Sequence, residues 1–187
     1  MMNIKELLMD SPIIPACRSE EQFADSLSSN AKVIFVLESN INNFKERVNA
    51  IKSSNKYAFV HFDLISGFSQ DNEALKYVVD ICQPHGIITT RKNLINCGKK
   101  LGLYTIQRMF LIDTTSISSA INMARQTKPD AIEILPGIAP KVIMAMKNKI
   151  DIPIITGGLI TNKKEINNAL KAGAVGVSVS KKAMWEL

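Results

Sequence analysis

The sequence predicts a (β/α)8 barrel of the TIM type, built by a single domain that spans residues 1–187. The main observation is a strict alternation of eight short apolar runs with eight segments whose apolar residues recur at helical spacing. The apolar runs are mostly continuous, which is typical of parallel strands buried on both faces. Because the chain is short for this fold, we expect minimal connections and one degenerate outer helix. The alternative is an open doubly wound sheet, but its G-x-G-x-x-G fingerprint does not follow the first strand.

Capping residues mark the helices predicted in the first half of the chain. Ser19 has the position of an N-cap, and Gln22 follows it at the spacing of a capping box. Asp71 has the same position before the third helix, and Gly102 follows the fourth. The predicted strands are 13–17, 33–37, 57–64 and 86–90. The helix after the first strand begins at Ser19, the next two helices cover 41–52 and 71–82, and the fourth ends at Leu101.

Prolines and glycines mark the boundaries in the second half. Pro129 follows one helical segment, Pro136 and Gly137 break the sixth strand, and Gly173 ends the helix before the last strand. The predicted strands are 105–111, 131–135, 152–156 and 174–179. The helix after the first of these strands begins at the capping residues 113–116, and the next begins at Pro140. The third covers 162–172, and a short last helix covers 181–186.

A glycine turn after the seventh predicted strand is a candidate phosphate site. Gly157 and Gly158 let backbone N–H groups approach an anion closely, because neither carries a side chain. Ser178 and Ser180 add hydroxyl groups where the eighth strand ends. The loops after strands seven and eight often bind phosphate in this fold, so we expect these four residues to meet at one rim. The alternative is an ordinary turn between a strand and a helix.

Polar side chains also collect at the carboxyl ends of other strands, where barrels of this fold place their sites. Because side chains alternate along a strand, we expect Gln107 and Thr156 to point into the barrel mouth and Ile106 to face the helices. An ion pair of Arg108 with a carboxylate is the structural alternative for part of this set. The residues expected to line a ligand pocket are His61, Asp63, Thr90, Gln107, Arg108, Glu133 and Thr156.

The composition argues against several classes of protein. No apolar run reaches the ~20 residues of a membrane span, and the first residues lack the pattern of a signal peptide. Three widely spaced cysteines (Cys17, Cys82 and Cys97) favour a reducing cytoplasm over a disulfide framework. We expect no metal site, because the chain has only two histidines. We also expect no catalytic residue and no cofactor, since no serine lies in a nucleophile elbow and no lysine lies within a predicted strand.

The charge is unevenly distributed along the chain. The net charge is +6, yet residues 1–90 carry 8 Lys and Arg against 11 Asp and Glu, whereas residues 91–187 carry 15 against 6. A basic half can attract polyanions such as nucleic acids. The alternative is a set of solvated helix faces, and no RNA-binding motif with interleaved aromatic residues is present.

Six short motifs lie along almost the whole chain. In order they are Ile13-Ile14-Pro15-Ala16, His61-x-Asp63-Leu64-x-x-Gly67, Gly86-Ile87-Ile88-x-Thr90-Arg91, Gln107-Arg108-x-Phe110-x-x-Asp113, Glu133-Ile134-Leu135-Pro136-Gly137 and Gly157-Gly158-Leu159-Ile160. Together they resemble the glycerol uptake operon antiterminator regulatory proteins of bacteria. One departure follows the eighth strand, where Val179 interrupts the pair of adjacent hydroxyl residues that the family usually has.

The resemblance implies a barrel that senses glycerol 3-phosphate and binds the leader of a glycerol-utilisation messenger RNA, where it lets transcription pass a terminator. On that basis the partners are glycerol 3-phosphate and an mRNA leader, with no membrane. The candidates for contacts to the RNA backbone are Lys141, Lys163, Lys164, Lys181 and Lys182. The sequence leaves open whether the chain forms a homo-oligomer.

Two other functions stay open at the level of the sequence. The first is an isomerase, aldolase or lyase that acts on a small phosphorylated metabolite with Asp63 or Glu133 as its base, because this fold hosts many chemistries. The second is a barrel that keeps a phosphate site without any activity. The lack of a clear nucleophile, Schiff-base lysine or metal cluster favours a sensor over an enzyme.

Overall fold

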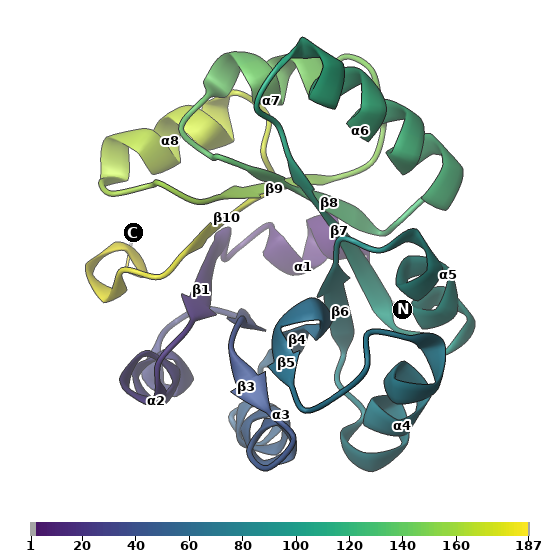
Figure 1. Cartoon of the computed structure of the whole chain (residues 1–187). Helices are drawn as coiled ribbons and strands as arrows, with labels where there is room; N and C mark the ends of the chain where they lie inside the picture. The colour runs from purple at the N-terminus through teal and green to yellow at the C-terminus, as the bar shows by residue number, and fades with distance from the viewer. Residues whose placement is uncertain (1–2, 187) are drawn as a thin grey trace.

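The computed structural model describes residues 3–186. Eight parallel strands close into a barrel in the order β1-β10-β9-β8-β7-β6-β4-β2, so the predicted (β/α)8 architecture is confirmed (Figure 1). The strands of the barrel are β1 (Ile13–Cys17), β2 (Val33–Val36), β4 (Tyr57–His61), β6 (Gly86–Thr89), β7 (Tyr104–Phe110), β8 (Ala131–Leu135), β9 (Ile154–Gly157) and β10 (Gly176–Val179).

Seven helices surround the barrel, one between each pair of consecutive barrel strands. They are α2 (Glu20–Ser28), α3 (Phe44–Ser53), α4 (Asn72–Cys82), α5 (Lys92–Lys100), α6 (Thr114–Thr127), α7 (Pro140–Lys147) and α8 (Lys163–Lys171). Side chains of Ser19, Asp71 and Asp113 accept hydrogen bonds from the first turns of their helices, as N-caps do. The eighth helix is reduced to the 3-10 turn η2 (Lys182–Met184), so the expected degenerate helix is the last one.

The structure differs from the predicted elements in several places. A short helix, α1 (Ile4–Leu8), was not predicted; Ile4, Leu7 and Leu8 pack with Phe35 and Phe59 inside the barrel, at the end where the strands begin. The predicted strand 57–64 ends at His61 instead, and Phe62–Leu64 forms a 3-10 turn, η1. Beyond it, β5 (Ile65–Ser66) pairs with β3 (Ser39–Asn40) outside the barrel.

The barrel encloses one apolar cluster, and the helices cover two more. The interior cluster includes Phe35, Phe59, Tyr104, Ile106 and Ile155, and the rings of Phe35 and Phe59 lie 5.9 Å apart. This packed interior closes the barrel below its carboxyl-terminal mouth, so within the barrel a ligand can be held only at the mouth. No helix within residues 3–186 is long and apolar enough to cross a membrane.

Candidate functional site

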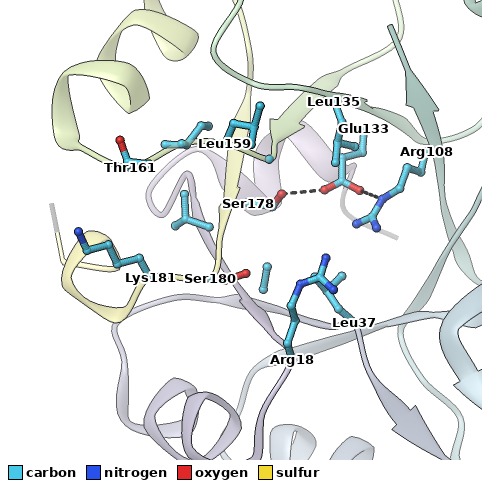
Figure 2. Close-up of a pocket in the computed structure, with 14 residues that line it drawn as sticks. Arg18, Leu37, Arg108, Glu133, Leu135, Leu159, Thr161, Ser178, Ser180 and Lys181 are labelled. Atoms are coloured by element: carbon cyan, nitrogen blue, oxygen red, sulfur yellow. Dashed lines mark hydrogen bonds and ion pairs between the residues drawn. The ribbon is translucent and has the colours of Figure 1, made fainter. Parts of the chain in front are cut away.

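The mouth of the barrel contains a cavity of about 290 Å³. Its walls come from the carboxyl ends of β1, β7, β8 and β10 and from the loops after β1, β2, β9 and β10 (Figure 2). Residues at opposite ends of the chain therefore meet here. The polar and charged side chains of the lining are Arg18, Arg108, Glu133, Thr161, Ser178, Ser180 and Lys181.

A buried carboxylate forms the floor of this cavity. Glu133 on β8 has no exposed surface, and its Oε2 accepts a hydrogen bond of 2.7 Å from Nε of Arg108, its direct neighbour on β7. Its other oxygen, Oε1, accepts one of 2.7 Å from the hydroxyl of Ser178 on β10 (Figure 2). An unpaired buried carboxylate would be strongly unfavourable, so this hydrogen-bonded set is what allows Glu133 to lie inside the barrel.

Cations dominate the rest of the cavity. Arg108 is engaged with Glu133 through Nε, and its guanidinium group points into the space that Arg18 also faces (Figure 2). Arg18 follows β1 directly and forms a half-exposed ion pair of 2.8 Å with Glu38. Lys181 lines the cavity after β10. Three cations thus surround a single lining carboxylate, and the site is suited to an anion.

The four residues of the predicted phosphate site meet at one rim, with different environments. Gly158, Ser178 and Ser180 line the cavity. Gly157 lies beside Ser178 on the neighbouring strand, and a Cβ at Gly157 would lie 2.0 Å from the Ser178 hydroxyl oxygen. Gly157 therefore gives room to Ser178 rather than contacting the cavity itself. The Ser178 proton is donated to Glu133, so this hydroxyl is not the free phosphate donor that we expected.

Two residues predicted to point into the mouth face the helices instead. Gln107 accepts a hydrogen bond of 2.6 Å from the hydroxyl of Thr127 at the end of α6, while its neighbour Ile106 packs inside the barrel. The hydroxyl of Thr156 donates to the backbone oxygen of Ile134, 3.0 Å away. The predicted side-chain alternation was wrong on these two strands, and neither residue lines the cavity.

Asp63 and Thr90 form a separate polar cluster beside the cavity. The Asp63 carboxylate, on the turn η1, accepts hydrogen bonds from the hydroxyls of Thr89 and Thr90 at 2.5 and 2.7 Å, and from the backbone N–H of Thr90 at 2.7 Å. These bonds join η1 to the end of β6. The predicted pocket roles of Asp63 and Thr90 are therefore not supported, because neither residue lines the cavity.

His61 points into the barrel as predicted, but it is 3 % exposed and lies outside the cavity lining. Burial, and secondarily the positive charge of Arg108, lower its pKa to about 3. Its ring is therefore neutral at pH 7, and its Nδ1 has no hydrogen-bond partner among the described residues. A neutral imidazole next to Arg108 adds no charge to the anion site.

We expect acidification to destabilise the protein through His61. Its pKa is lower in the folded state than in the unfolded chain, so the unfolded chain takes up the proton first and stability falls as the pH drops below ~6.5. Between pH 7 and pH 5 this residue should cost about 2 kcal/mol of unfolding free energy. Urea denaturation of the wild type and of His61→Asn at both pH values measures the effect; equal losses in the two proteins would contradict it.

The five lysines proposed as RNA contacts all lie around the mouth. Lys141 is in the first turn of α7, and Lys163 and Lys164 begin α8. Lys181 lines the cavity, and Lys182 pairs with Asp25 at 2.7 Å. Sequence reasoning missed Arg18 as a site residue, although a charged residue directly after a strand was the available signal. Residues 3–186 contain no group of three His, Cys, Asp or Glu side chains that could hold a metal ion.

A family model described as glycerol-3-phosphate responsive antiterminator matches residues 13–185. The chain belongs to this family. Its sequence is 33 % identical to the protein YgcP of Escherichia coli K12 over 186 residues, which is 100 % of this chain and 97 % of YgcP.

Two crystal structures of glycerol uptake operon antiterminator and antiterminator-related proteins are similar to this chain. The glycerol uptake operon antiterminator regulatory protein of Listeria monocytogenes 4b F2365 has 32 % identity and a TM-score of 0.91, covering 95 % of this chain and 96 % of that one. The glycerol uptake operon antiterminator-related protein of Thermotoga maritima MSB8 has 26 % identity and a TM-score of 0.84, covering 95 % of this chain and 99 % of that one. The aldolase QR15, at 13 % identity and a TM-score of 0.72, shares the fold alone and covers 92 % and 91 %.

Proposed function

We propose that this antiterminator binds glycerol 3-phosphate at the barrel mouth and, in that state, binds the mRNA leader of glycerol-utilisation genes. The observation that carries the effector assignment is the mouth cavity, in which Arg18, Arg108 and Lys181 face one buried carboxylate. In this proposal the phosphate lies among the three cations, next to the loop of Gly158 and Ser180. Charge-assisted hydrogen bonds to a phosphate are the stronger kind, and Arg can make two in parallel.

The hydroxyl groups of the ligand would lie toward the floor of the cavity. There Glu133 offers carboxylate oxygens as acceptors. The guanidinium of Arg108 offers further N–H donors besides the Nε–H that is bound to Glu133. A phosphate placed on this floor would meet the Glu133 carboxylate and be repelled. The arrangement therefore supports one orientation, with the phosphate outward and the glycerol chain inward.

The same geometry favours a regulator over an enzyme. Both oxygens of Glu133 already accept hydrogen bonds, and Asp63 lies outside the cavity with its carboxylate bound to Thr89 and Thr90. Neither carboxylate is placed as a free base against a ligand. We therefore propose a non-enzymatic protein that acts in the cytoplasm, where transcripts are made. Binding of RNA and of glycerol 3-phosphate would be coupled, each raising the affinity for the other by the same factor.

We expect Gly158→Val to abolish binding of glycerol 3-phosphate while the protein stays folded. Gly158 has φ +77°, and a Cβ there would lie 3.1 Å from Leu135 in the cavity wall. The substitution should cost about 1–3 kcal/mol through backbone strain and push the loop out of place. Calorimetric titration with glycerol 3-phosphate measures the affinity, and thermal unfolding measures the strain.

Gly102→Val provides the matched control for this experiment. Gly102 has φ +74°, but it follows α5 at the opposite end of the barrel, and a Cβ there meets nothing within 4 Å. This variant should lose a similar amount of stability and keep its affinity. If Gly158→Val binds glycerol 3-phosphate with unchanged affinity, the loop after β9 is not part of the effector site.

A further inference from the structure

The end of the barrel opposite the mouth carries a continuous strip of cations. Helices α5, α6, α7 and α8 follow one another around one side of the barrel (Figure 1), and each of them has Lys or Arg in its last turn or directly after it. We define six of these residues, all exposed, as the basic crescent: Lys99, Lys100, Arg125, Lys128, Lys149 and Lys171.

Contacts between the helix ends show that the crescent is one surface rather than scattered charges. Nζ of Lys99 donates to the backbone oxygens of Thr127 and Lys128, at the end of the next helix, at 3.3 and 2.8 Å. Arg125 in turn donates to the backbone oxygen of Lys149 at 3.0 Å. The aliphatic part of Lys147 lies close to Gly173 after α8, 2.9 Å from the position of a Cβ. The ends of the four helices are therefore in contact.

Stabilisation of the helix ends explains only part of this charge. Lys99 and Arg125 satisfy carbonyl oxygens at the helix ends, which cations there normally do. Lys100, Lys128, Lys149 and Lys171 form no ion pair with any residue in 3–186. The nearby Asp130 carboxylate is bound to the N–H and hydroxyl of Thr105 at 2.8 Å. Four cations are thus left to face solvent.

The mouth differs from the crescent because carboxylates accompany its cations, although Lys141, Lys163 and Lys164 there form no ion pair within residues 3–186 either. Arg18, Arg47, Arg108 and Lys182 each pair with a carboxylate there. Acidic residues also occupy the first turns and N-caps of the helices that begin at this end, namely Glu20, Glu21, Glu46, Asp71, Glu73, Asp113 and Glu165. Outside the cavity the rim therefore carries both signs of charge, which makes it less favourable for a long polyanion than the crescent.

The crescent also contains a groove of about 410 Å³ between the ends of α6 and α7. Arg125, Lys128 and Lys149 line it together with Ile150 and Ile152, and Asp151 is its single carboxylate. Cations beside a partly apolar groove suit a strand that presents phosphates and also bases or sugars.

We infer that the basic crescent is the surface that binds the phosphate backbone of the RNA, on the side of the barrel opposite the effector cavity. This inference rests on the proposed function, which supplies RNA as the partner. Lysines without ion-pair partners bind phosphates by releasing counterions, and no desolvated ion pair has to be broken first.

One strand connects the two sites. On β7, Arg108 points into the effector cavity, and the adjacent Gln107 accepts the hydrogen bond from Thr127, the residue that precedes Lys128. A shift of β7 when Arg108 binds the effector would therefore reach the groove through the Gln107–Thr127 hydrogen bond. RNA and effector can then be coupled without touching each other.

The test compares two variants that remove the same charge from opposite ends of the barrel. The crescent variant replaces Lys100, Lys128, Lys149 and Lys171 with Gln. The mouth variant replaces Lys141, Lys163, Lys164 and Lys182 with Gln. The probe is the leader transcript of the glycerol-utilisation genes, titrated by filter binding with saturating glycerol 3-phosphate over a range of salt concentrations. Calorimetry with glycerol 3-phosphate and circular dichroism check that both variants are folded and bind the effector.

The crescent variant should lose on the order of 100-fold in RNA affinity at moderate salt, and its slope of log K against log salt should fall by about 3. Its affinity for glycerol 3-phosphate should match the wild type, and the mouth variant should keep most of its RNA affinity. If the mouth variant loses RNA binding and the crescent variant keeps it, the inference is wrong and the proposed function stands. If the wild type itself binds no leader RNA, the proposed function fails, and the crescent assignment fails with it.

Discussion

Replacing Arg108 with methionine should lower the free energy of unfolding by about 3–5 kcal/mol. Glu133 has no exposed surface, and within residues 3–186 Arg108 is its only cationic partner. Removal of the guanidinium leaves a carboxylate inside the barrel with one remaining hydrogen bond, from Ser178. The midpoint of thermal unfolding should fall by roughly 10 °C, given ~2–4 °C per kcal/mol for a domain of this size.

A triple variant separates this structural role from ligand binding. Adding Glu133→Leu and Ser178→Ala to Arg108→Met removes the whole buried polar set, so most of the lost stability should return. The triple variant should still fail to bind glycerol 3-phosphate, because the groups that recognise it are gone. If the free energy of unfolding of the Arg108→Met variant lies within about 1 kcal/mol of the wild-type value, Glu133 is not held in a buried ion pair, and our description of the cavity floor is wrong.

The second large effect concerns the hydroxyl groups of the effector. Propyl phosphate keeps the phosphate and the three-carbon chain of glycerol 3-phosphate but has neither hydroxyl. We expect it to bind about 100-fold more weakly, because it leaves Glu133 and the guanidinium of Arg108 facing methylene groups. Inorganic phosphate should bind more weakly still, since it has no glycerol chain to contact the cavity floor.

Calorimetric titration of the three compounds against the wild type measures this order. Arg18→Gln adds a control for the outer part of the cavity, since Arg18 is half exposed and contacts Glu38 rather than Glu133. This variant should weaken all three ligands by a similar factor and keep their order. Equal affinities of glycerol 3-phosphate and inorganic phosphate for the wild type would show that the cavity floor does not recognise the glycerol chain.

The barrel could be predicted from the sequence because each strand is a short apolar run that is recognisable without its neighbours. On β8, Glu133 lies between Ile132 and Ile134, so only one face of the strand can be the polar one, and its orientation was predicted correctly. On β7, both faces contain polar residues: Thr105 and Gln107 share one face, and Ile106 and Arg108 share the other. Hydropathy does not distinguish these two faces when both are buried. Thr127, which decides the orientation by its hydrogen bond to Gln107, is twenty residues away in sequence.

Other features depend on contacts between distant segments and were not predicted. Helix α1 has only five residues, and its stability comes from burial of Ile4, Leu7 and Leu8 against the barrel interior. The basic crescent joins the ends of four helices that are separated in the chain, so its lysines looked like ordinary solvated positions. A count of charges along the sequence showed the basic half, but only the fold shows at which end of the barrel those charges lie.

The central claim, a barrel that binds RNA in response to glycerol 3-phosphate, is tested most directly by titrating the leader transcript with and without the effector at one fixed salt concentration. We expect the affinity for the leader to rise at least fivefold when glycerol 3-phosphate is present, the lower end of common allosteric couplings. The affinity for glycerol 3-phosphate should rise by the same factor when the leader is present. An affinity for the leader that does not change with the effector, together with turnover of a phosphorylated metabolite by the purified protein, would contradict this account and identify the barrel as an enzyme.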